Sequence, residues 1–168
     1  TALDVTIQAE IIKLVRDIQQ EFKTAIMWIT HDLGIVAGLA DNVNVMYAGR
    51  IVERGGVLDI FERPLHPYTQ GLLGSVPKLG GAGQRLSSIP GVPPNLIDLP
   101  AGCPFQPRCL HAKDVCRAEN PELGMADSDG HLAACFFWRE IQERRSADHT
   151  PSTRRPCRAA GRAPAPRR

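Results

Sequence analysis

A histidine and an aspartate follow directly after a short apolar run near the start of the chain. In WITHDLGIVA, residues 28–37, His31 and Asp32 come after the run Ala25–Ile29. A neutral imidazole offers one hydrogen-bond donor and one acceptor, so it can meet a phosphate or a water held beside it. The local pattern equally fits a histidine packed at a sheet edge and bonded to a carbonyl. Both interpretations of His31 stay open at this point.

Four cysteines form a second chemical group, spaced by five, six and eighteen intervening residues: Cys103, Cys109, Cys116 and Cys135. These gaps exceed the spacing of common zinc knuckles, although structural zinc also takes four thiolates. No secretion signal is visible, so the chain would meet a reducing cytosol, where ligand clusters are favoured over disulfides. The alternatives are a [4Fe-4S] cluster, a Zn²⁺ ion or unliganded thiols. Cys157 lies in the tail and is not expected to be a ligand.

The elements that must position these residues follow from the spacing of apolar side chains. We expect a helix over residues 5–22, capped by Asp4 or Thr6. The uninterrupted apolar stretch at 24–30 predicts a parallel strand buried on both faces. A short helix at 32–40 and two strands within 42–55, joined at Ala48-Gly49, complete an α/β order that ends near Gly56.

After residue 56 the composition of the sequence changes. Two short helical pieces separated by Pro64 and Pro67 precede a loop rich in Gly and Pro. The predicted parts are residues 1–56, residues 57–138 with the four cysteines, and a disordered basic tail at 139–168. From Thr150 to Arg168 the chain has six arginines, four prolines and no acid.

Composition excludes some classes of protein. The net charge of +2 is too balanced to indicate nucleic-acid binding, and no apolar run approaches the ~20 residues of a membrane span. The chain begins at Thr1 inside a helical pattern, so we expect an upstream segment.

Three segments in order resemble the last third of the ATPase domain of ATP-binding cassette transporters: TALDVTIQAEIIKLVRDI, AIMWITHD and NVNVMYAGRIVERG. Thr1-Ala2-Leu3-Asp4 resembles the loop after the nucleotide-site strand, with Thr where Ser is commoner. His31-Asp32 resembles the motif after the next strand. The resemblance implies that His31 is the switch histidine that hydrogen-bonds the γ-phosphate and the attacking water. It places Asp4 at the interface where two ATPase domains enclose ATP.

Two further segments resemble the oligopeptide and dipeptide importer branch of that family. RPLHPYTQGLLGSVP, residues 63–77, resembles the extension that follows the ATPase domain there, and we expect His66 to pack rather than to catalyse. GCPFQPRCLHAKDVC, residues 102–116, resembles the cysteine motif associated with a [4Fe-4S] cluster in that branch. Arg108 or Lys113 could offset the negative charge of a thiolate-ligated cluster. The fold class is therefore α/β: the C-terminal part of a P-loop-type ATPase domain followed by a small, loop-rich, cysteine-ligated extension.

The resemblance implies an importer subunit that couples ATP hydrolysis, with Mg²⁺, to uptake of di- or oligopeptides from the cytoplasmic face of the membrane. Its implied partners are a second ATPase subunit, integral-membrane permeases and, indirectly, an extracytoplasmic solute-binding protein, with no nucleic acid. No G-x-x-x-x-G-K-[ST] motif is present, so the chain alone should not hydrolyse ATP. The alternatives are an importer for another solute such as nickel, a non-transport ATPase of the same superfamily, and a non-enzymatic metal-binding interaction module.

Overall fold

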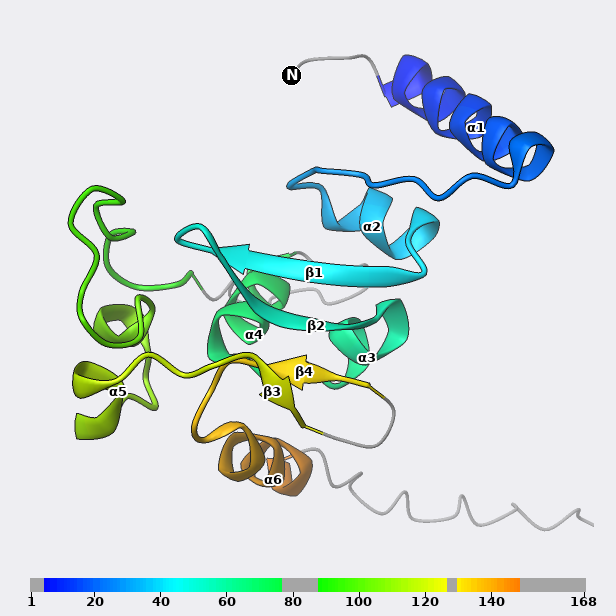
Figure 1. The fold of residues 1–168 in the computed structure, drawn as a ribbon. Coiled ribbons are helices and arrows are strands. Elements are labelled where there is room, and N and C mark those ends of the chain that lie inside the picture. Colours follow the sequence, from blue (N-terminus) through cyan, green and yellow to red (C-terminus); the bar gives the residue numbers. More distant parts are fainter. Residues whose placement is uncertain (1–4, 77–87, 127–129, 149–168) are drawn as a thin grey trace, which may run out of the picture.

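The computed structural model describes residues 5–76, 88–126 and 130–148 of the 168-residue chain (Figure 1). Asp4 and Cys157 lie outside these residues, so their predicted roles stay predictions. The helices are α1 Val5–Phe22, α2 Leu33–Leu39, α3 Val57–Glu62, α4 Pro67–Gly74, the 3₁₀ turn η1 Gln106–Arg108, α5 Asp114–Ala118 and α6 Trp138–Asp148. The strands are β1 Asn42–Tyr47, β2 Arg50–Gly56, β3 Gly124–Met125 and β4 Leu132–Ala133.

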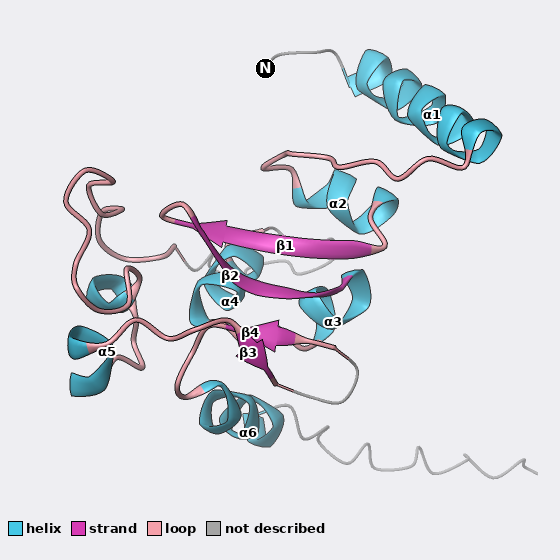
Figure 2. Cartoon of the chain, in the orientation of Figure 1, coloured by secondary structure: helices cyan, strands magenta, loops and turns pink. Residues whose placement is uncertain are grey.

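The four strands form one antiparallel sheet in the order β1-β2-β4-β3 (Figure 2). β2 pairs with β1 along its length and with β4 through Glu53 opposite Ala133 and Arg54 opposite Leu132. Strands from both sides of the predicted boundary at Gly56 therefore share hydrogen bonds. The segments 1–56 and 57–138 are joined in space by this sheet.

The predicted hairpin is confirmed. Ala48 and Gly49 both have positive φ, 49° and 77°, which is the backbone of the two-residue turn that matches the twist of paired strands. The helix predicted at 32–40 is also present as α2. Its N-cap is Asp32, whose carboxylate accepts hydrogen bonds from the amides of Gly34 at 2.8 Å and Ile35 at 3.3 Å.

The predicted buried strand at 24–30 is wrong for this chain. These residues form an extended connection between α1 and α2 that belongs to no sheet (Figure 2). Met27 and Ile29 are 86% and 90% exposed. A strand needs hydrogen-bonding neighbours, and none of the described residues supplies one. The fold is mixed α and β, but its sheet is antiparallel rather than parallel.

The first helix forms where the sequence predicts it, but its apolar side is open. α1 stands apart from the sheet in Figure 1 and contacts α2 through the Arg16 guanidinium, which donates to the Gly38 carbonyl. Large apolar side chains repeat at helical spacing along one face of α1, and all are exposed: Ile7, Ile11, Leu14, Ile18 and Phe22. Such a stripe is what a helix normally buries against a neighbour.

The buried core lies between the hairpin, the segment of α3 and α4, and the cysteine-rich part. Tyr47, Val52 and Phe105 form its centre, while α3 packs against β2. The helix α6 continues to Asp148, within the region that the sequence assigned to a disordered tail. Ile141, 3% exposed, anchors α6, which explains why its helical structure extends past residue 139. Residues 149–168 lie outside the described part.

Candidate functional site

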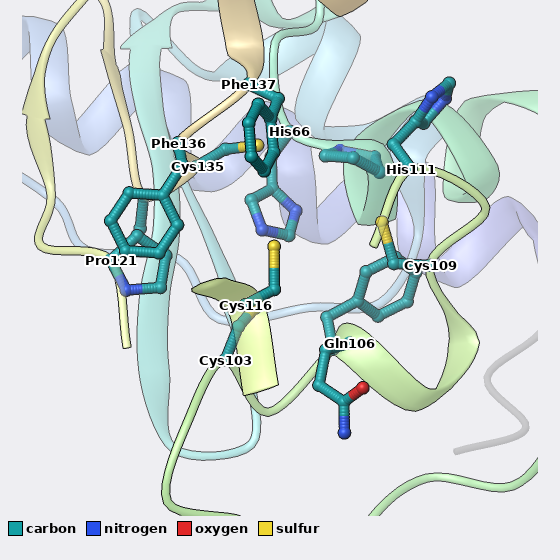
Figure 3. Close-up of a pocket in the computed structure, with 13 residues that line it drawn as sticks. His66, Cys103, Gln106, Cys109, His111, Cys116, Pro121, Cys135, Phe136 and Phe137 are labelled. Carbon is teal, nitrogen blue, oxygen red and sulfur yellow. The ribbon is translucent and has the colours of Figure 1, made fainter. Parts of the chain in front are cut away.

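All four predicted cysteine ligands line one pocket (Figure 3). Cys103 and Cys109 flank the short turn η1, Cys116 lies on α5, and Cys135 follows β4. The pocket is small, with about 20 Å³ open to a water-sized molecule. The fold therefore brings together thiols that are far apart in the sequence, as the sequence analysis expected of a ligand set.

Local backbone geometry positions the first three thiols. The amide of Cys103 donates to the carbonyl of Cys116 at 2.8 Å, which ties the first ligand segment to α5. Gly102 makes this approach possible, because a Cβ at that position would lie 2.3 Å from the same carbonyl. Between Cys103 and Cys109, η1 folds the chain back through the hydrogen bond from the Gln106 amide to the Cys103 carbonyl at 3.0 Å.

The sheet positions the fourth thiol. Ala134 donates its amide to the carbonyl of Val52 on β2 at 2.8 Å and is 7% exposed. This bond holds the residue before Cys135 against the hairpin. Cys135 lines the pocket, as do Phe136 and Phe137, which follow it.

Burial favours the neutral thiol at Cys103, Cys109 and Cys135. Desolvation raises the pKa of Cys135 to about 12, and the neighbouring thiols of Cys109, Cys103 and Cys116 push it the same way. Burial likewise raises the pKa of Cys103 and of Cys109. A reactive thiol nucleophile has a lowered pKa, so thiols with a raised pKa are poor nucleophiles. Four thiolates would form here only with a compensating positive charge such as a metal.

The two cations proposed to offset such a charge have other partners. Arg108 donates from Nε to the Pro90 carbonyl at 2.8 Å. Lys113 forms an ion pair of 2.7 Å with Glu140 and lies 4.0 Å from the ring centre of Phe137. Both side chains thus fasten neighbouring segments around the pocket.

The thiols are not arranged around a single-ion site. Within residues 5–76, 88–126 and 130–148, no group of three or more His, Cys, Asp or Glu side chains could hold one metal ion. A zinc ion would need sulfur atoms within about 2.3 Å of its centre. The pocket therefore gathers the thiols without the tight tetrahedron that zinc requires.

The predicted switch histidine lies away from this pocket. His31 is exposed at the end of the extended connection, directly before the helix cap Asp32. The Asp32 amide also donates to the Thr30 hydroxyl at 3.0 Å, which shapes the turn that presents His31. His31 is not among the residues that line the cysteine pocket, so the two predicted sites are separate.

Glu53 is a buried carboxylate that was not predicted from the sequence. Glu53 is fully buried, and its oxygens accept the amides of Leu65 at 2.7 Å and His66 at 2.9 Å. Nε2 of the buried His131 lies 2.8 Å from Glu53 Oε1. Glu53 thus joins β2, the turn between α3 and α4, and the residue that leads into β4. The available signal was Leu65-His66 between two prolines, a turn whose amides need an acceptor.

His66 caps a helix and packs, as expected from the sequence. Its Nδ1 accepts the amide of Tyr68 at 3.1 Å at the start of α4, and its ring centre lies 5.7 Å from that of Phe105. Burial lowers the pKa of His66 to about 4, although the charge of Glu53 opposes this shift. A neutral ring fits its role as the hydrogen-bond acceptor of the cap.

Comparisons with known proteins give similarities over most of the chain. Residues 52–116 match the family model of the oligopeptide/dipeptide transporter C-terminal region. The chain is 55% identical over 136 residues to the oligopeptide transport ATP-binding protein OppD of Salmonella typhimurium. The matched residues make up 81% of this chain and 40% of the relative. OppD of Haemophilus influenzae is 55% identical over 140 residues, 83% of this chain and 43% of the relative.

A more distant similarity extends to another bacterium. The oligopeptide transport ATP-binding protein AppD of Bacillus subtilis is 48% identical over 140 residues, which is 83% of this chain and 42% of the relative. The chain thus spans about two fifths of the length of these curated relatives.

Proposed function

We propose that this chain is the C-terminal part of an ATP-binding subunit of a peptide importer and belongs to the oligopeptide/dipeptide transporter family. In this function, ATP hydrolysis drives uptake of di- or oligopeptides across the cytoplasmic membrane. The observation that carries the proposal is the 55% identity to OppD over 136 residues, which includes both the hairpin and the cysteine-rich part. The three sequence segments that resemble an ATP-binding cassette domain agree with it.

The open apolar surface supports a larger ATPase domain around this chain. The stripe on α1 and the side chains of Met27 and Ile29 are exposed, although soluble proteins rarely leave contiguous apolar surface of this kind uncovered. We propose that polypeptide outside the present sequence covers both, and that residues 24–30 pair there as a strand. This arrangement would fix the position of His31.

His31 is the chain's proposed contribution to ATP hydrolysis. An exposed imidazole at the end of that segment can donate a hydrogen bond to a phosphate oxygen and orient a water. Phosphoryl transfer depends mainly on positioning and charge stabilisation, so one well-placed donor is worth ~10² or more in rate. The phosphate cradle, the Mg²⁺ ligands and ATP itself would be held by residues outside this chain. Asp4 would lie at the interface with the second ATPase subunit.

The four cysteines are proposed to hold a [4Fe-4S] cluster, with Zn²⁺ as the alternative. They fit this group because all four line one buried pocket in which the thiols, once ionised, would need a metal's positive charge. A [4Fe-4S] cluster takes four thiolates, which is the number of cysteines that line this pocket. When bound, it supplies covalent crosslinks between four points of a segment with few apolar residues. Cys103, Cys109, Cys116 and Cys135 would then be structural ligands.

The proposed partners follow from the importer assignment. They are a second, identical or different ATPase subunit, the integral-membrane permeases and, indirectly, an extracytoplasmic solute-binding protein. In the part of the chain that the structure describes, no helix is long and apolar enough to cross a bilayer. The importer assignment leads us to propose a peripheral location on the cytoplasmic face, through contact with the permeases.

Reconstitution tests the function. The full-length subunit should co-purify with permease subunits and support ATP-driven peptide uptake into proteoliposomes. Changing His31→Ala should reduce ATP turnover by ~10² or more while ATP binding persists. Asn44→Ala, at an exposed position on β1, is the control and should leave turnover unchanged. A subunit that hydrolyses ATP but associates with no permease would point to the non-transport ATPase instead.

A further inference from the structure

Two side chains of the loop between Cys103 and Cys109 contact the hairpin. Phe105 and Arg108 lie in or beside η1, the turn that separates these two cysteines. Both side chains reach Tyr47, the last residue of β1. The same few residues therefore serve the cysteine pocket and the tip of the hairpin.

Phe105 is the apolar half of this connection. It is 3% exposed, and its ring centre lies 5.2 Å from that of Tyr47 in an edge-to-face arrangement. The ring of Tyr68 lies 5.6 Å away on another side. Cys103 and Cys109 pack directly against the cluster that Phe105 forms with Tyr47. A shift of either cysteine would displace the ring that fills the hairpin's core, because packed interiors leave few voids to absorb it.

Arg108 is the polar half. Its Nε donates to the Pro90 carbonyl at 2.8 Å, and its Nη2 donates to the Ile89 carbonyl at 3.3 Å. Its Nη1 donates to the Tyr47 hydroxyl at 3.3 Å. One planar guanidinium thus joins the cysteine loop, the segment at 89–90 and the end of β1. Its fork of donors makes this a contact that lysine cannot reproduce.

The loop has little structure of its own to hold these side chains. Its regular part is the three-residue η1, and 3₁₀ turns of this length are marginal by themselves. A metal bound to both Cys103 and Cys109 would fix the loop's ends and lower the entropy cost of its ordered form. A cavity of about 450 Å³ lies beside the hairpin tip and is lined by Tyr47, Arg50 and Phe105. The tip therefore has room to move if Phe105 withdraws.

We propose that metal occupancy of the four-cysteine pocket controls the order of the hairpin tip, Tyr47–Arg50, through Phe105 and Arg108. This inference rests on the metal centre of the proposed function and deepens it. The metal then does more than crosslink its own segment, since its loss loosens a hairpin that lies in the ATPase part of the resemblance. The stability of β1 and β2 therefore depends on whether the pocket holds a metal.

Hydrogen exchange on the full-length protein tests the inference. The protein is purified anaerobically, and its iron, sulfide and zinc are counted. Metal is then removed with ferricyanide and EDTA, and the thiols are returned to the reduced state so that no disulfide replaces the metal. Amide exchange in peptides covering residues 42–56 should become about tenfold faster after removal.

Two arginine variants test whether the change in exchange is specific to this connection or reflects a general loss of stability. Arg108→Lys should speed exchange in the same peptides while metal content stays at the wild-type value. Arg117→Lys is the matched control, because Arg117 follows Cys116 as Arg108 precedes Cys109 but pairs with Asp114 on its own helix. It should change neither exchange nor metal content.

The outcomes distinguish the two proposals. A protein that contains no metal overturns the metal centre and this inference with it. A metal-loaded protein whose hairpin exchange is the same before and after removal overturns the inference alone. Equal effects of Arg108→Lys and Arg117→Lys would also overturn it.

Discussion

The Glu53 carboxylate and the His131 imidazole lie 2.8 Å apart, and both side chains are at most 1% exposed. They are 78 positions apart in the sequence. Glu53 belongs to the hairpin and His131 to the approach to the last strand, so this pair holds the two predicted parts of the chain together. The two backbone amides that Glu53 also accepts make it the acceptor for three separate segments.

Removing this carboxylate should destabilise the whole fold. Glu53→Ala leaves two buried amides and a buried imidazole without their acceptor, which typically costs ~3 to 5 kcal/mol. Urea denaturation followed by circular dichroism measures the loss. Glu62→Ala, an exposed glutamate on α3, is the control and should change the free energy of unfolding by less than ~0.5 kcal/mol. Similar values for the two variants would show that the buried network contributes nothing.

The low pKa of His66 predicts an acid-sensitive fold. Burial lowers this pKa from 6.5 to about 4, so between these values the unfolded chain binds a proton that the folded chain does not. Stability is therefore complete above pH 6.5 and falls as the pH drops toward 4, by up to ~1.4 kcal/mol per pH unit from this group. Thermal melts of the metal-free, reduced protein across this range measure the slope.

His66→Asn isolates this contribution from that of the carboxylates. Asparagine is a good N-cap residue and does not titrate, so the variant should lose part of the pH dependence between 6.5 and 4. Wild-type and variant curves of equal slope would contradict the assignment to His66.

How much of this fold the sequence could predict depends on the distance between interacting residues. The short helix that starts near Asp32 and the Ala48-Gly49 turn were predicted because their hydrogen bonds and backbone angles are local. The strand predicted at 24–30 is wrong, because none of the described residues pairs with this segment. Glu53 was not predicted because its partner His131 lies on a distant segment, and no local pattern marks a buried hydrogen-bonded pair.

For the cysteine site, the residues could be predicted from the sequence, but their contacts with other segments could not. The presence of four cysteines close together in a chain without a secretion signal indicated a ligand set, and the fold does gather all four thiols in one pocket. The contacts of Arg108 with Tyr47 and the Ile89 carbonyl could not be predicted, because they join three segments distant in sequence. Residue types predicted that the four thiols lie together, whereas the connection of their pocket to the hairpin required the tertiary structure.

Metal analysis of cysteine variants tests the proposed ligands. Anaerobically purified full-length protein should contain iron and sulfide in the ratio of a [4Fe-4S] cluster, and Cys135→Ser should lose most of both. Cys157→Ser is the control, since Cys157 is not expected to be a ligand, and should keep the full metal content. Equimolar zinc without iron or sulfide would overturn the cluster assignment, and Cys109→Ser should then deplete zinc instead.

The exposed connection at 24–30 gives a test of the proposed covering polypeptide. Met27 and Ile29 are almost fully exposed in this chain, so changing each to alanine should alter its stability by less than ~0.5 kcal/mol. If residues 24–30 become a buried strand in the full-length subunit, the same changes there create cavities and cost ~2 to 5 kcal/mol each. Urea denaturation of the 168-residue chain and of the full-length protein, with and without each change, measures the difference.

Leu58→Ala is a suitable control for both proteins, because Leu58 is 69% exposed on α3 and lies outside the open stripe of α1 and the 24–30 segment. It should cost little in either one. Small costs for Met27→Ala and Ile29→Ala in the full-length subunit would mean that this segment stays uncovered. His31, which depends on the segment for its position, would then have no fixed place beside a phosphate, and the proposed role of the histidine would fall with the strand.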